Sequence, residues 1–166
     1  VKQVSKTTEV DERLAALATN SSAISSLSTA VEGTIGPKGL DCMLVDKYGD
    51  VTVTNDGATI LDKIDTSHPA TKMLIRAARA QEEEIGDGTT TTTILAAALI
   101  AEGVGHVSRG VPVAKIIEGM RIGIRATLEY VESISTESDV KDDSIRSVAL
   151  VAARGNSEIA DLIVSA

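Results

Sequence analysis

The sequence predicts a mainly α-helical domain that carries one small β-hairpin. Apolar residues recur at helical spacing over several long segments of the 166-residue chain. Only residues 42–54 show two short strand patterns around a turn. The composition is 43% hydrophobic, with two Tyr and neither Phe nor Trp. A sizeable core is therefore expected, and it must be aliphatic.

Composition and charge exclude several classes of protein. The net charge of −8 and the pI near 4.7 argue against a nucleic-acid partner. The single cysteine, Cys42, leaves no internal disulfide and suits a reducing compartment. No signal peptide and no 18-residue apolar run is evident, so we expect a cytoplasmic protein with no membrane partner. His68 and His106 are too few, with one cysteine, for a zinc site.

The first long helix is expected to start at residue 9, after a polar and loose segment at 1–8. Gly33 and Pro37 end it, and residues 34–39 then form a compact turn. The core-facing stripe of this helix consists of Val10, Leu14, Leu17, Ile24, Leu27 and Val31.

A β-hairpin follows, with strands at 42–46 and 51–54 around a turn at 47–50. The two valines of the second strand face one side and its two threonines face the other. An isolated hairpin is marginal in water, and open edges are usually paired or covered. We expect another subunit to supply the partner strand, or residues 1–8 of an adjacent copy.

Two further helices are expected after the hairpin. The turn Asn55-Asp56-Gly57 leads into a short helix at 58–63. Pro69 opens the next helix, which runs to Ile85 with Gly86 as its C-cap.

The segment 94–107 is apolar on nearly all sides, which is typical of a buried helix. We therefore expect it to be the most buried element, with Leu95 and Leu99 inside. Pro112 begins another helix with an apolar stripe that continues to Val131.

The last part of the chain is expected to be a polar linker and two short helices. The linker covers 133–143, and the helices cover 144–152 and 157–166. The sequence stops directly after an apolar run with no capping residues, which we interpret as a domain cut short.

The candidate site is the turn Gly86-Asp87-Gly88 and the five threonines that follow it at 89–93. Glycines allow a tight turn and the close approach of another group. A helix that begins there presents unpaired N–H groups to a phosphate. Asp87 would repel that phosphate unless a cation lay between them, and Mg²⁺ commonly binds to one or two carboxylates together with phosphate oxygens. The alternative is an Asp cap on an ordinary helix.

Four motifs together resemble the chaperonins. They are Thr-Ile-Gly-Pro-Lys-Gly at 34–39, Thr-Asn-Asp-Gly-Ala-Thr-Ile-Leu at 54–61, His-Pro-Ala at 68–70 and Gly-Asp-Gly-Thr-Thr-Thr at 86–91. The match is to the group II type (thermosome-like and eukaryotic cytosolic) or to its bacterial group III relatives. The resemblance implies an equatorial-domain-like helical bundle, with the N-terminal part of the equatorial ATP-binding domain at 1–138 and a truncated start of the intermediate domain at 139–166.

The resemblance also implies residue roles. Asp56 is similar to the catalytic acid that orients the attacking water, and Asp87 is similar to the Mg²⁺ ligand. The implied nucleotide-binding residues are Thr34, Ile35, Gly36, Pro37, Asn55, Asp87, Gly88, Thr89, Thr90 and Thr91.

The implied function is that of an ATP-dependent protein-folding ring subunit, with ATP and Mg²⁺ as cofactors. Its implied partners are unfolded proteins, bound through an apical domain outside this sequence, and neighbouring subunits in a double ring. Other catalytic and adenine-contacting residues of the family lie in its C-terminal half, so the segment alone is expected to be inactive. Two alternatives stay open: an assembly module with a vestigial phosphate site, and a free-standing Mg²⁺-dependent phosphotransfer enzyme. The latter would lack the P-loop pattern G-x-x-x-x-G-K-[ST].

Overall fold

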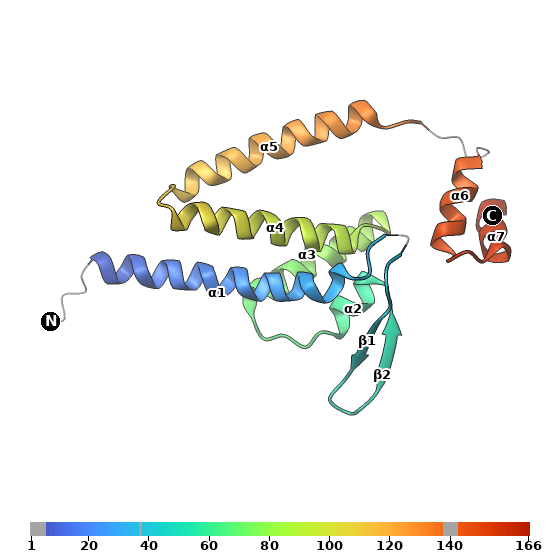
Figure 1. Cartoon of the computed structure of the whole chain (residues 1–166), viewed down its shortest axis with the longest axis horizontal. Helices are drawn as coiled ribbons and strands as arrows, with labels where there is room; N and C mark the ends of the chain where they lie inside the picture. The colour runs from blue at the N-terminus through green and yellow to red at the C-terminus, as the bar shows by residue number, and fades with distance from the viewer. Residues whose placement is uncertain (1–5, 37, 138–142) are drawn as a thin grey trace. The chain divides into compact units, whose positions relative to one another are not determined.

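The computed structural model describes residues 6–36, 38–137 and 143–166. The chain divides into two compact units, Val1–Met120 and Arg121–Ala166, and each is described by itself. The elements, labelled in Figure 1, are α1 (Lys6–Glu32), β1 (Cys42–Val45), β2 (Val51–Thr54), α2 (Gly57–Lys63), α3 (Pro69–Ile85), α4 (Thr89–Ser108), α5 (Val113–Ile134), α6 (Asp143–Ala152) and α7 (Ser157–Ser165). The predicted fold class is confirmed: the described chain is mainly helical and carries one two-stranded antiparallel sheet.

The core of the N-terminal unit is aliphatic and lies where α1, α2, α3 and α4 meet. The short helix α2 supplies two of its most buried residues, Ile60 at 0% and Leu61 at 1% exposure. The predicted stripe of α1 is buried at Ile24, Leu27 and Val31, and the side chain of Val10 lies outside the described residues.

The predicted boundaries of α3 are confirmed. Pro69 is its first residue, where a missing N–H has no cost. Gly86 ends it in the left-handed conformation at φ 78°, and its N–H donates to the carbonyl of Glu82 at 2.9 Å. Helix α1, in contrast, already begins at Lys6. The last three residues of the segment predicted to be loose are therefore helical, and residues 1–5 lie outside the described part of the chain.

The prediction that the 94–107 helix is buried on all sides is wrong for this chain. Leu95 is 58% exposed and Leu99 is 41% exposed. The buried face of α4 instead carries small residues, Thr93 and Ala97 among them, which let α1 and α3 approach closely. The sequence of α4 is apolar on nearly all sides, but the neighbouring helices of this chain cover only one of its faces.

By length and composition, α4 is also the one described helix that could cross a membrane. Core helices of soluble proteins pass the same test, so the observation is weak evidence.

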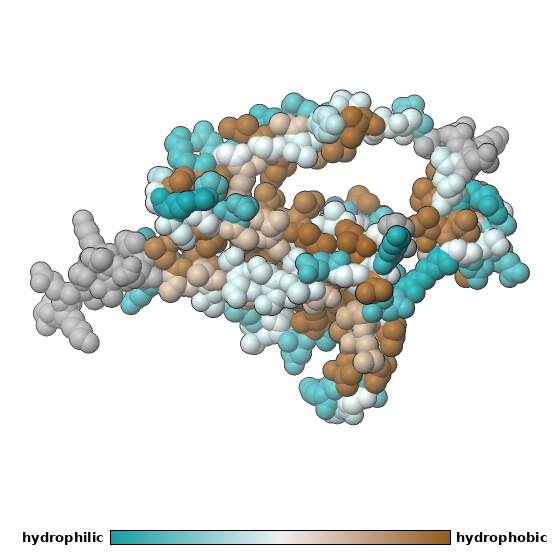
Figure 2. All heavy atoms as spheres, in the orientation of Figure 1, coloured by the Kyte–Doolittle hydropathy of each residue, from teal (hydrophilic) through white to brown (hydrophobic). Residues whose placement is uncertain are grey.

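The hairpin has an apolar outer face. Met43 pairs with Val53 and Val45 pairs with Val51, and all four side chains are 59–66% exposed. The threonines of β2 lie on the opposite, half-buried face, as the alternation predicts. Figure 2 shows the hydrophobic residues that gather along the hairpin. Among the described residues the sheet has only these two strands, so neither outer edge has a strand partner in this part of the chain.

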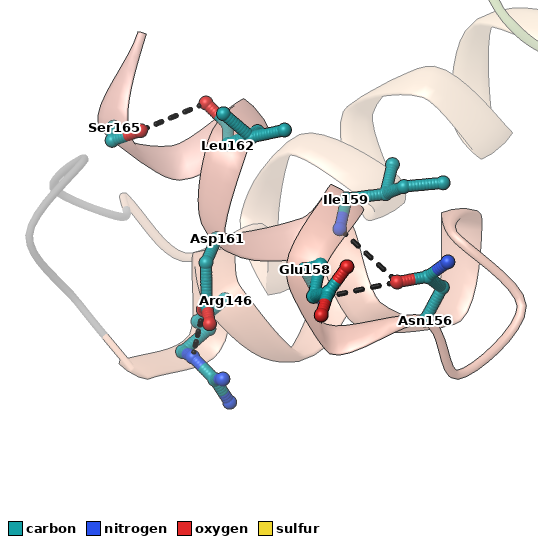
Figure 3. A network of polar contacts seen from close by, with 7 residues as sticks. All are labelled: Arg146, Asn156, Glu158, Ile159, Asp161, Leu162 and Ser165. Carbon is teal, nitrogen blue, oxygen red and sulfur yellow. Dashed lines mark hydrogen bonds and ion pairs between the residues drawn. The ribbon is translucent and has the colours of Figure 1, made fainter.

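The C-terminal unit contains the second part of α5 and, after it, the predicted pair of short helices, α6 and α7. Figure 3 shows how they are joined: Arg146 Nε donates to Asp161 Oδ1 at 2.8 Å, from α6 to α7. The side chain of Asn156 caps α7 by accepting from the backbone N–H groups of Glu158 and Ile159 at 3.1 and 3.2 Å. The predicted domain boundary between 138 and 139 lies outside the described residues and stays a prediction.

Candidate phosphate-binding site

Two turns that each carry an aspartate meet in the N-terminal unit. One precedes α2 and contains Asp56, and the other precedes α4 and contains Asp87. Between them, Gly57 is buried so closely against the start of α4 that a Cβ there would lie 2.3 Å from Thr90 Oγ1 and 3.2 Å from Thr90 N. Only glycine fits this contact, so the sequence Asn-Asp-Gly joins the two turns directly.

The start of α4 lacks a side-chain cap, and its first residue, Thr89, is buried. Its N-cap, Gly88, has φ 83° and makes no side-chain hydrogen bond to the first turn. The first helical bond is donated by Thr92 N to the carbonyl of Gly88 at 2.8 Å. The N–H groups of Thr89, Thr90 and Thr91 precede that bond, and no side chain caps them. Such N–H groups, together with the helix dipole, bind an anion.

The carboxylate of Asp87 lies beside this helix start and is exposed. Its Oδ1 accepts a hydrogen bond from the N–H of Gly88 at 2.6 Å. From α3, Gln81 Nε2 donates to the carbonyl of Asp87 at 3.0 Å, so the turn is held by the helix that precedes it. Sequence reasoning missed Gln81, because a contact across the end of its own helix has no pattern in the sequence.

Asp56 is the N-cap of α2. Its Oδ2 accepts from the Thr59 backbone N–H at 2.8 Å and from the Thr59 hydroxyl at 2.5 Å. The hydroxyl bond is the largest cause that lowers the pKa of Asp56 below its ordinary value of 3.8; partial burial opposes it, and the backbone N–H groups of Thr59 and Ala58 add to it. Asp56 is therefore ionised at neutral pH. The Asp-x-x-Thr spacing would have revealed Thr59, since N-cap and third helical position face each other.

The turn after α1 lies at the same end of the bundle, because α1 and α4 run antiparallel to one another (Figure 1). Thr34 is buried, and its hydroxyl donates to the carbonyl of Val31 at 2.8 Å. Gly36 has φ 85°, and a Cβ on Gly39 would lie 2.0 Å from the Thr34 carbonyl oxygen. Both glycines are thus required by the fold of the turn.

The remaining predicted residues of this turn differ in their surroundings. Ile35 is 50% exposed. Pro37 lies outside the described residues. Asn55, directly before Asp56, is half-buried.

No group of three or more His, Cys, Asp or Glu side chains that could hold a metal occurs within the described residues. A cleft of about 720 Å³ lies elsewhere, between the hairpin and residues 62–65, and none of the predicted nucleotide-binding residues lines it.

Comparison with known proteins decides the family. The sequence profile of the TCP-1/cpn60 chaperonin family matches residues 27–166. The chain belongs to the chaperonin family. It is 40% identical over 141 residues to thermosome subunit alpha of Saccharolobus solfataricus, covering 81% of this chain and 25% of that protein. It is 42% identical over 146 residues to thermosome subunit alpha of Methanothermobacter thermautotrophicus, covering 84% and 27%.

A solved chaperonin has the same fold. The crystal structure of a group III chaperonin in the open state matches with a TM-score of 0.84 and 43% identity. The match covers 95% of this chain and 32% of that one. The chain spans about a quarter of the length of the two thermosome subunits. The resemblance to an N-terminal equatorial segment is thereby confirmed.

Proposed function

We propose that this chain is the N-terminal, nucleotide-binding part of the equatorial domain of an ATP-dependent protein-folding chaperonin subunit. The observation that carries the proposal is the contact of Gly57 with Thr90, which joins the two aspartate turns at an uncapped helix start. Membership of the chaperonin family supports ATP as the ligand. The cytoplasm is the proposed location, in keeping with the single cysteine.

The proposed roles of Asp87, Gly88 and the threonines follow from their position at the start of α4, and the other roles follow from the resemblance to the chaperonins. The N–H groups of Thr89, Thr90 and Thr91 bind phosphate oxygens, and Gly88 leaves the approach clear. Thr34, Ile35, Gly36, Pro37 and Asn55 complete the nucleotide contacts from the neighbouring turns. Asp87 is the protein ligand of Mg²⁺, which when bound offsets the charge of the phosphates. Asp56 accepts a hydrogen bond from the attacking water and orients it.

The two other functions are less well supported. A free-standing phosphotransfer enzyme would need a phosphate-binding lysine, and the chain lacks the P-loop pattern that supplies one. A vestigial site would not require the exclusion of every side chain at Gly57 or an uncapped start to α4. Nucleotide binding is therefore the function that these contacts favour.

The two aspartates give the test of this function in the intact protein. Asp87→Ala should weaken Mg²⁺–ATP binding by roughly tenfold or more, because the phosphate charge loses its bridging cation. Asp56→Ala should leave ATP binding within about twofold of wild type and lower the turnover by roughly a hundredfold, because water is oriented only in the reaction. Equilibrium ATP titration and steady-state ATPase assays separate the two. Wild-type turnover in both variants would contradict the assigned roles.

We propose further that the hairpin contacts a neighbouring subunit in a double ring, and that the ring acts on unfolded proteins. Four exposed apolar side chains and two unpaired edges of the described sheet favour an interface there. Lys6–Thr8 are helical, so these three residues of the 1–8 segment would not supply the partner strand.

Val53→Pro tests this interface in the intact protein. Proline removes a backbone donor and fixes φ at an angle unsuited to the strand, so subunits should be released while the helices stay folded. Val53→Ile is the matched control and should keep the ring. Gel filtration with circular dichroism reports both properties, and an intact ring for Val53→Pro would refute the interface.

A further inference from the structure

The hydroxyl of Thr59 makes a different hydrogen bond from those of three other threonines within helices. The hydroxyls of three others donate to the carbonyl four residues earlier at 2.8–2.9 Å: Thr19 to Ala15, Thr93 to Thr89 and Thr127 to Gly123. That is the common arrangement of a helical threonine. Thr59 lies in the first turn of α2, and its hydroxyl donates to the carboxylate of Asp56 at 2.5 Å instead.

The bond from the Thr59 hydroxyl is additional to the N-cap bond of α2. The backbone N–H of Thr59 reaches Asp56 Oδ2 at 2.8 Å, which satisfies the helix start. The hydroxyl donates to the same oxygen. Two donors on one oxygen fix the plane of the carboxylate, so the direction of Oδ1 is fixed as well. A bond of this length to an ionised group is also stronger than one between neutral groups.

The backbone beneath Asp56 is held from the other side. Gly57 lies in van der Waals contact with Thr90, so the Cα of Asp56 cannot move relative to the start of α4 without separating the two helices. The remaining freedom of Asp56 is rotation about its own side-chain bonds, and the Thr59 hydroxyl removes it. The N–H of Asp56 in turn donates to Thr54 Oγ1 at 3.1 Å, which restrains the preceding backbone.

We propose that Thr59 is a positioning residue for ATP hydrolysis: its hydroxyl holds the Asp56 carboxylate in the direction from which it orients the attacking water. This inference rests on the proposed role of Asp56. Thr59 touches neither the nucleotide nor the water in this account, and it acts only through Asp56. Its loss should therefore lower the rate of hydrolysis without weakening the binding of ATP.

The test compares Thr59→Val and Thr59→Ser in the intact protein. Valine has the same shape and keeps the backbone N–H of the cap, but lacks the hydroxyl, whereas serine keeps the hydroxyl. We expect Thr59→Val to lower single-turnover ATP hydrolysis by roughly tenfold with the Kd for ATP unchanged within about twofold. Thr59→Ser should hydrolyse within about twofold of the wild type. Thr19→Val removes an exposed hydroxyl far from the site and is the matched control.

The pH dependence of the hydrolysis rate is a second measurement, and it would not change if Thr59 had only a structural role. Without the hydroxyl the pKa of Asp56 rises toward its ordinary value, so the acid limb of the hydrolysis rate should shift to higher pH in Thr59→Val alone. Wild-type hydrolysis in Thr59→Val, or a Thr59→Ser variant as slow as Thr59→Val, would overturn the inference. If Asp56→Ala also hydrolyses ATP at the wild-type rate, the proposed role of Asp56 has failed; if Asp56→Ala is slow and Thr59→Val is not, only the inference about Thr59 has failed.

Discussion

Two helix starts lie against each other in the N-terminal unit, and they are built in opposite ways. Helix α2 is closed by its own N-cap, because Asp56 accepts hydrogen bonds from Thr59 in the first turn. Helix α4 is left open, because its N-cap is Gly88 and no side chain caps its first turn. The same unit thus contains a helix start that holds an acid and a helix start that offers donors to an anion.

The difference between the two helix starts shows how neighbouring turns can have two roles, one orienting a carboxylate and the other offering N–H donors. A capped start uses its carboxylate internally, so that group is oriented and kept ionised. An uncapped start has a free-energy cost of its own, which a bound phosphate would offset. The C-terminal unit supplies a third case, since Asn156 closes α7 with an uncharged side chain. Helix α3 also starts without a side-chain cap, since its N-cap His68 makes no such hydrogen bond. The start of α4 is therefore distinguished by its glycine turn and its contact with Gly57.

The largest expected effect on ATP turnover comes from separating the start of α2 from the start of α4. In Gly57→Ala the new methyl group would lie 2.3 Å from Thr90 Oγ1 and 3.2 Å from Thr90 N. Rotation of the threonine relieves only the first contact, so α2 and α4 must move apart. We expect ATP turnover to fall by about a hundredfold and the free energy of unfolding to fall by about 1–3 kcal/mol. ATPase assays and thermal unfolding of the intact protein measure these changes.

A second glycine in a helix supplies the control. Gly123 in α5 has no atom within 4 Å of a Cβ built on it. Gly123→Ala should therefore keep turnover and raise helix stability by about 0.5–1 kcal/mol. If Gly57→Ala behaved like Gly123→Ala, the contact between the two helix starts would not matter for the site.

Local signals in the sequence predicted much of this arrangement. Pro69 and Gly86 fixed the ends of α3, because each favours one backbone conformation at one helix position. The glycines around Asp87 likewise predicted a tight turn before α4, and both adopt positive φ in the structure. The hairpin was predicted from its alternation, although its strand β1 ends at Val45, one residue earlier than expected.

Contacts between distant segments could not be predicted in this way. The burial of Gly57 against Thr90 joins residues 33 positions apart, and Gln81 reaches Asp87 across the end of a helix. The burial of α4 was predicted wrongly for a related reason. Hydropathy shows which residues avoid water, but which neighbours cover Leu95 is decided by the arrangement of other elements.

The smallest expected effect tests how much the charge of Asp56 contributes to capping the start of α2. In Asp56→Ala, α2 loses its cap, and the amides of α2 should exchange hydrogen about fivefold faster at pH 7, which corresponds to about 1 kcal/mol. The pKa of Asp56 is lowered in the folded protein, so its contribution is complete above the ordinary value of 3.8 and is lost as the pH falls through the lowered value. The difference in exchange rate between Asp56→Ala and wild type should therefore shrink below pH 3.8.

Asn156→Ala is the control, because it removes the cap of α7 at a similar cost. An amide does not titrate, so the difference in exchange rate between Asn156→Ala and wild type should be the same at pH 7 and below pH 3.8. An Asp56→Ala difference that is equally independent of pH would show that α2 is closed by hydrogen-bond geometry alone, without help from the charge.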